Sequence, residues 1–137
     1  MFLRFLQCLK PKLLKPKLPS LGKRGESEAE KFLLGMGFEL IARNWRCKIG
    51  EIDLVMKKGD ELVIVEVKTR QFCPRAKGRI FDPVDMRKQR KLKKLAEIFK
   101  MLHAQYKSLS LRIDLVGVVI DDSHKNPVRI EHIQSAL

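Results

Sequence analysis

The pattern of apolar and polar positions divides residues 21–137 into alternating helices and strands. A first helix is predicted over Gly22–Met36, which Gly35 and Gly37 close, because apolar residues recur at helical spacing at Ala29, Phe32, Leu33 and Met36. A strand is expected over Phe38–Arg46, and two apolar strands joined by a tight turn follow in residues 50–70. This half of the pattern therefore reads as a helix, a strand and a β-hairpin.

The second half of the pattern predicts a loop, a long helix and further strands. Residues 71–82 read as a loop, and a helix is expected to start near Pro83, whose fixed φ suits a first helical turn. The apolar stripe of that helix consists of Val84, Leu92, Leu95, Phe99 and Leu102. A strand follows over Leu111–Ile120, and Val128–Ile133 forms either a last short strand or a terminal turn. The order α-β-β-β-α-β indicates one α/β domain over residues 21–137.

The predicted hairpin fixes which side chains face one another. A two-residue turn at Gly59-Asp60, with glycine first, suits a type II′ hairpin. A four-residue loop over residues 58–61 would give the same register. Either turn places Asp53 directly opposite Glu66, and opposed residues project from the same face of a sheet.

Lys68 lies two residues after Glu66, so it should project from that face as well. Opposed carboxylates in an apolar strand pair are destabilising, and a cation between them would offset the repulsion. Mg²⁺ or Mn²⁺ suits this role, because both ions bind carboxylate oxygens and retain waters. The alternative is a surface hairpin with solvated charges, in which Glu51 and Lys68 form a cross-strand ion pair. Residues 62–67, with few polar interruptions, are more typical of a central strand covered on both faces.

The order of Asp53 and then Glu66-Val67-Lys68 resembles the PD-(D/E)xK nuclease superfamily. The chain is more similar still to the YraN-like family of bacterial proteins, described as predicted endonucleases distantly related to archaeal Holliday-junction resolvases. The resemblance runs from about Leu21 to the C-terminus. It is carried by Gly22-Lys23-Arg24-Gly25-Glu26, Gly37-Phe38, Arg43-Asn44-Trp45-Arg46, Gly50-Glu51-Ile52-Asp53-Leu54, Val65-Glu66-Val67-Lys68-Thr69-Arg70, Lys88-Gln89-Arg90-Lys91-Leu92 and Arg129-Ile130-Glu131-His132-Ile133.

This resemblance implies a restriction-endonuclease-like three-layer core, a mixed sheet flanked by helices. It also implies a Mg²⁺-dependent (or Mn²⁺-dependent) DNA endonuclease that hydrolyses phosphodiester bonds, with branched or structured DNA as one candidate substrate. Asp53 and Glu66 would hold the metal, and Lys68 would position or activate the attacking water. Glu26 would be a third metal ligand.

From the residue pattern alone, Glu26 is instead a first-turn acid that favours the helix dipole. Its neighbours Glu28 and Glu30 are the acids most easily confused with it.

Basic residues are in large excess. Lys and Arg number 29 against 16 Asp and Glu, which gives a net charge of +13 and favours polyanionic partners: DNA, RNA or an acidic membrane surface. Six of the eight residues at 87–94 are basic, and Lys88 lies within the apolar stripe, so it should point toward the sheet. The candidate nucleic-acid contacts are Arg70, Lys88, Gln89, Arg90, Lys91 and Lys94.

Residues 1–20 are expected to form a flexible basic extension. Pro11, Pro16 and Pro19 prevent a long helix there, and no small-x-small cleavage site follows the short apolar part. Such an extension would add phosphate affinity or rest on an anionic membrane.

Three scattered cysteines, Cys8, Cys47 and Cys73, have no zinc-binding spacing and favour a reducing, cytoplasmic setting. The sequence contains no apolar run long enough to span a bilayer. Two other classes of function are left open: a nucleic-acid-binding protein that keeps the nuclease fold without catalysis, and a peripheral membrane protein. A homodimer is also left open.

Overall fold

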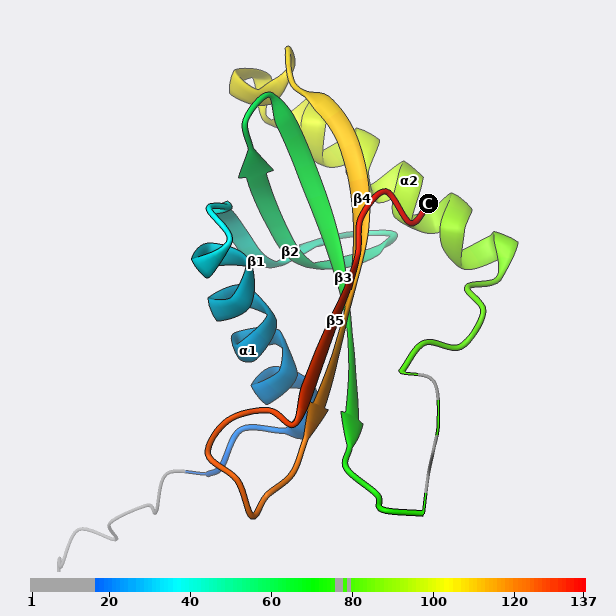
Figure 1. Cartoon of the computed structure of the whole chain (residues 1–137). Helices are drawn as coiled ribbons and strands as arrows, with labels where there is room; N and C mark the ends of the chain where they lie inside the picture. The colour runs from blue at the N-terminus through cyan, green and yellow to red at the C-terminus, as the bar shows by residue number, and fades with distance from the viewer. Residues whose placement is uncertain (1–16, 76–77, 79) are drawn as a thin grey trace, which may run out of the picture.

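The computed structural model describes residues 17–75, 78 and 80–137, so most of the predicted N-terminal extension lies outside the described residues. The domain is a five-stranded sheet with one long helix on each face (Figure 1). The elements are α1 (Leu21–Gly35), β1 (Glu39–Cys47), β2 (Gly50–Lys58), β3 (Glu61–Gln71), α2 (Met86–Leu102), the 3₁₀ turn η1 (Ala104–Tyr106), β4 (Ser110–Ile120) and β5 (Arg129–Ile133). None of the described helices is long and apolar enough to cross a membrane.

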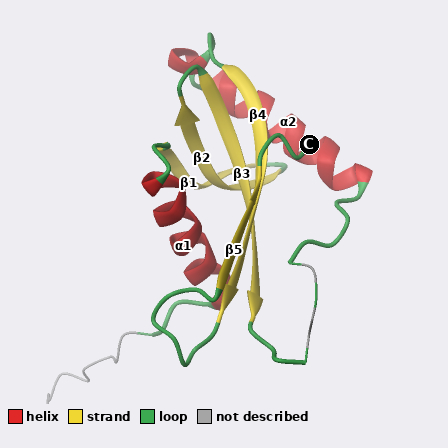
Figure 2. Cartoon of the chain, in the orientation of Figure 1, coloured by secondary structure: helices red, strands yellow, loops and turns green. Residues whose placement is uncertain are grey.

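The strands lie in sequence order, β1-β2-β3-β4-β5. β1, β2 and β3 are antiparallel neighbours, β3 and β4 are parallel, and β5 adds antiparallel to β4. A parallel pair needs a crossover connection, and the loop after β3 together with α2 supplies it (Figure 2). The predicted order α-β-β-β-α-β is confirmed and is consistent with a restriction-endonuclease-like core. Residues 129–133 form a strand rather than only a terminal turn.

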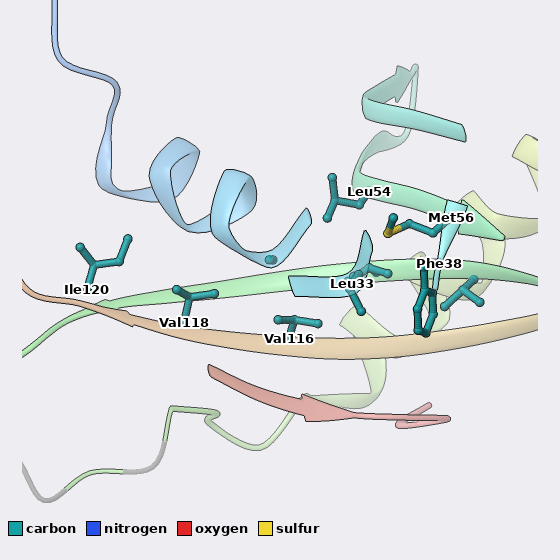
Figure 3. Close-up of a cluster of buried hydrophobic side chains, with 10 residues drawn as sticks. Leu33, Phe38, Leu54, Met56, Val116, Val118 and Ile120 are labelled. Atoms are coloured by element: carbon teal, nitrogen blue, oxygen red, sulfur yellow. The ribbon is translucent and has the colours of Figure 1, made fainter. Parts of the chain in front are cut away.

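Alternate side chains along the strands contribute to two separate apolar cores, one on each face of the sheet. Leu54 and Met56 of β2 pack in the cluster beneath α1, which also contains Leu33 and Val116 (Figure 3). Val55, between them in sequence, belongs to the cluster beneath α2. Because both faces are covered, the central strand β3 is apolar almost continuously, as residues 62–67 predicted.

The start of α2 differs from the prediction. The helix begins at Met86 and not near Pro83, because Asp85 occupies the cap position and its carboxylate accepts the N–H of Lys88 at 2.8 Å. Asp is among the preferred N-cap residues, so the helix starts immediately after it. Val84 therefore precedes the helix and does not belong to its apolar stripe.

The buried faces of the two helices are slightly narrower than predicted. Leu102 is 62% exposed at the end of α2, and Met36 is 42% exposed just after α1. α1 begins at Leu21 behind the capping residue Ser20. The buried residues of α2 are Leu92, Leu95, Ala96 and Phe99.

Candidate active site

The hairpin register is confirmed. Leu54 of β2 pairs with Val65 of β3, and the turn carries a positive φ of 57° at Gly59, which glycine adopts readily. The next pair in this register is Asp53 with Glu66, and the regular ladder ends just before it. The two carboxylates therefore lie where β2 and β3 stop pairing.

Asp53 occupies the opening between the strands. Its carboxylate accepts a hydrogen bond from the backbone N–H of Val67 at 2.8 Å, in place of a main-chain acceptor on β2. β1 is also irregular at this level: it pairs with β2 on both sides of Asn44 but not at Asn44 itself, which has a φ of 46°. Asn is one of the few residues that tolerate this left-handed conformation. The ladders are therefore interrupted on both sides of Asp53.

Asn44 connects this opening to α1. Its Nδ2 donates to the Glu26 carboxylate at 2.7 Å, and the Lys23 ammonium lies 3.3 Å from the same oxygen. α1 is close to the sheet here, because a β-carbon at Gly25 would lie only 1.8 Å from the Thr69 hydroxyl oxygen. Glu26 lies in the second turn of α1, so its description as a first-turn acid is wrong. The sequence analysis assigned no role to Asn44, although an Asn within an apolar strand is a signal for positive φ.

The neighbouring acids of α1 have other partners. Glu28 pairs with Lys31 at 3.1 Å, and Glu30 pairs with Arg43 at 2.6 Å. Of these three acids, it is Glu26 that lies near enough to raise the pKa of Asp53.

The environment of Asp53 raises its pKa from 3.8 to about 7. Burial is the largest cause, and the charge of Glu66 is the second. The Val67 N–H opposes the rise in this pKa, while Glu26 and Glu51 add to it. The protonation of Asp53 is thus coupled to that of its acidic neighbours.

Glu66 has a cationic partner from α2. The Lys88 ammonium lies 2.7 Å from the Glu66 carboxylate, so Lys88 points toward the sheet as its place in the apolar stripe predicted. Lys68 is exposed and lines the same cavity as Glu66, but the ion pair of Glu66 in the described residues is with Lys88. Glu51 pairs with Arg46 at 2.8 Å, across β1 and β2, and not with Lys68.

Two adjoining hollows border Glu66. The first, of about 210 Å³, lies between β3, β4 and the segment that precedes α2. The second, of about 420 Å³, lies between the start of β2 and the face of α2. Glu66, Asp85 and Lys88 line both hollows, so together they form one groove beside the candidate site. Arg87 and Lys91 add positive charge to the second hollow.

The candidate nucleic-acid contacts fall into two groups. Arg70 pairs with Asp82 at 2.6 Å, Lys88 pairs with Glu66 at 2.7 Å, and the Gln89 side chain donates to the Val84 carbonyl at 3.0 Å, so these three side chains have partners within the domain. The remaining helix residues with exposed side chains are Arg90, Lys91 and Lys94.

The donor set suits a hard cation with few protein ligands. Within the described part of the chain, no three His, Cys, Asp or Glu side chains are grouped closely enough to hold a metal ion. Mg²⁺ is usually held by one or two carboxylates and keeps several waters. Asp53 and Glu66 would supply two carboxylates, so these residues fit Mg²⁺ or Mn²⁺ and do not fit a closed site of the zinc kind.

The fold and the site together define a mixed α/β domain in which carboxylates and lysines gather where the central hairpin opens. The model of the uncharacterised protein family UPF0102 matches residues 25–118, and the chain belongs to this family. A UPF0102 protein of Caldicellulosiruptor saccharolyticus is 42% identical over 101 residues, covering 74% of this chain and 83% of the relative. A UPF0102 protein of Desulforamulus reducens is 37% identical over 119 residues, covering 86% of this chain and 95% of the relative.

Proposed function

We propose that this protein is a Mg²⁺-dependent DNA endonuclease of the PD-(D/E)xK superfamily. One observation carries the proposal: Asp53 is a mostly buried carboxylate beside Glu66 and Glu26, and its pKa is raised to about 7. No salt bridge to Asp53 is formed by the residues that the structure describes. Such a carboxylate lowers the stability of the fold, and a bound cation would offset that cost.

Asp53 and Glu66 would hold the metal ion, with Glu26 assisting through its position at Asn44. A bound Mg²⁺ would polarise the phosphoryl oxygen and lower the pKa of a water molecule. Lys68, exposed on the same face of β3 as Glu66, would stabilise negative charge on the reacting phosphate. Arg87 and Lys91, which line the second hollow, would contact backbone phosphates on that side of it.

The test is cleavage of labelled single-stranded, duplex, flap and four-way-junction DNA with Mg²⁺, Mn²⁺ or EDTA. Asp53→Asn, Glu66→Gln and Lys68→Ala should each lower metal-dependent cleavage by orders of magnitude and leave DNA binding in EDTA largely intact. Glu97→Gln and Lys93→Ala are controls, because both residues are exposed on α2 and neither lines the groove. Cleavage that persists in EDTA, or site variants as active as these controls, would refute the proposal.

A nucleic-acid-binding protein without catalysis is the second candidate. The Lys88–Glu66 ion pair favours it, since Lys88 already neutralises one of the two carboxylates without any metal. Binding of DNA at moderate salt with no cleavage under any metal condition would support this second function.

A further inference from the structure

We infer that the 210 Å³ hollow beside Glu66 binds an unpaired nucleobase next to the phosphate at the candidate site, so that DNA with an unpaired base binds in preference to continuous duplex. The inference rests on the proposed function only in taking DNA as the partner. It adds the part of the substrate that this hollow would recognise.

The floor of the hollow belongs to the sheet, and its wall belongs to the segment before α2. Glu66 and Lys68 come from β3, and Leu115 lies directly beside Glu66 on β4. The wall is formed by consecutive residues, Phe81, Asp82, Pro83, Val84 and Asp85. The volume is several times the space of about 30 Å³ that one water molecule takes in the liquid, so it admits a planar ring.

The wall is fixed to the sheet. A β-carbon at Gly117 of β4 would lie 2.3 Å from Ile80 and 2.8 Å from the ring of Phe81, so both side chains rest directly on the strand backbone. Arg70 of β3 pairs with Asp82 at 2.6 Å. A wall that packs and pairs in this way is already formed before a ligand binds.

Lys68 and Lys88 line the hollow where it meets Glu66, and the rest of its lining fits a base better than a phosphate. Phe81, Pro83, Val84 and Leu115 offer apolar surface to the face of a ring. Asp82 and Asp85 would repel a phosphate, but carboxylates accept hydrogen bonds from amino groups such as N4 of cytosine. One oxygen of Asp85 caps α2 and one oxygen of Asp82 pairs with Arg70, which leaves the second oxygen of each to accept.

The charge of the adjoining hollow indicates on which side of the candidate site the DNA backbone would lie. Arg87 and Lys91 line it beyond the Lys88–Glu66 pair, so backbone phosphates suit that side and a base suits the other. A base within a duplex reaches such a pocket only after unstacking, which costs a few kcal/mol. A bulged, frayed or single-stranded base avoids most of that cost.

The experiment measures binding in EDTA, so that it does not depend on cleavage. The probes are a fluorescently labelled duplex and the same duplex with one bulged cytosine, one bulged thymine or one abasic bulge. We expect the bulged cytosine to bind about 5- to 160-fold more tightly than the abasic bulge, the range given by base stacking in single-strand binders.

Two variants locate the effect. Val84→Trp should fill the hollow and abolish the difference between cytosine and abasic bulges. Asp82→Asn should keep that difference and remove a preference for cytosine over thymine, since the amide can also donate. Asp122→Asn is the matched control, because Asp122 is likewise an exposed acid paired with an arginine, Arg24, at 2.6 Å. This control should bind like the wild type.

The outcomes separate this inference from the proposed function. Equal affinity for the cytosine and abasic bulges, or a full preference in Val84→Trp, overturns the pocket even if the protein cleaves DNA. A preference that behaves as expected supports the pocket even if no metal supports cleavage. Failure to bind any DNA in EDTA overturns the pocket, and the proposed function fails as well if no DNA is cleaved with Mg²⁺ or Mn²⁺.

Discussion

Replacing Asp53 with Asn should stabilise the metal-free protein at neutral and alkaline pH. In the folded protein the pKa of Asp53 is raised from 3.8 to about 7, mainly by burial and by Glu66. Asn has nearly the same shape and keeps an oxygen that can accept the N–H of Val67. The substitution therefore removes the charge and retains the packing.

The size of the effect follows from the pKa of Asp53. The difference between a pKa of 3.8 and one of about 7 corresponds to about 4 kcal/mol. This value is a ceiling, because the amide also loses hydration when it is buried. We expect a gain of about 1–3 kcal/mol in the free energy of unfolding. Most substitutions at partly buried positions destabilise, so even the direction is diagnostic.

The pH dependence of the stability gives an independent test of the sign of this effect. Because the pKa of Asp53 is higher in the folded state, folding takes up a proton between about pH 4 and pH 7, and this carboxyl lowers stability as the pH rises through that window. The advantage of Asp53→Asn over the wild type should therefore be near zero at pH 4, grow up to pH 7 and be constant above it. Comparing the two proteins cancels the titration of the groups that do not interact with Asp53.

The assay is chemical denaturation of both proteins in EDTA from pH 4.5 to 8.5, repeated with Mn²⁺. A ligand at 100 times its Kd adds about 2.7 kcal/mol, so Mn²⁺ should stabilise the wild type and do little for Asp53→Asn. Asp60→Asn, at the exposed tip of the same hairpin, is the control and should show neither effect. If Asp53→Asn is less stable than the wild type at pH 8, or if Mn²⁺ stabilises both proteins equally, the inference that Asp53 and Glu66 bind one cation together is wrong.

Three further predictions concern the surroundings of Asp53. Asn44→Gly should be more stable than Asn44→Ala by about 1 kcal/mol in denaturant melts, the reverse of the usual order in a strand, because φ is positive there; equal stabilities would contradict the strained backbone. Lys88→Met should increase the Mn²⁺-induced rise in Tm, because it removes the ammonium that competes for Glu66; an unchanged rise would mean that Lys88 does not compete with the metal. Reversing Lys91 and Lys94 to Glu should flatten the plot of log K against log salt by about 0.9 for each lost duplex phosphate contact, and an unchanged slope would exclude this face of α2 from the DNA interface.

The hairpin and its register could be predicted because both follow from local rules. The period of two along each strand and the glycine-first turn together fix the register. Leu54 therefore pairs with Val65, and the next position outward places Asp53 opposite Glu66, whatever surrounds the strands. The inward direction of Lys88 was also predictable, since it follows from helical periodicity.

The remaining features depend on contacts between residues distant in sequence. The distance from Lys88 to Glu66 depends on how α2 sits on the sheet, and the link from Asn44 to Glu26 depends on the approach of α1. The start of α2 could not be decided from local preferences alone, because Pro83 suits a first helical turn and Asp85 suits a cap. In the structure the cap at Asp85 determines where the helix begins.

The position of the site explains why the sheet is irregular there. Glu26 comes from α1 on one face of the sheet, whereas Lys88 comes from α2 on the other face. A continuous sheet would keep side chains from opposite faces apart. At Asp53, β2 pairs neither with Glu66 of β3 nor with Asn44 of β1, so the sheet no longer separates the side chains of its two faces. The charge of Glu26 from α1 then acts on Asp53, and Lys88 from α2 pairs with Glu66. The positive φ at Asn44 and the interrupted pairing of Asp53 thus lie where charged side chains from both layers approach one another.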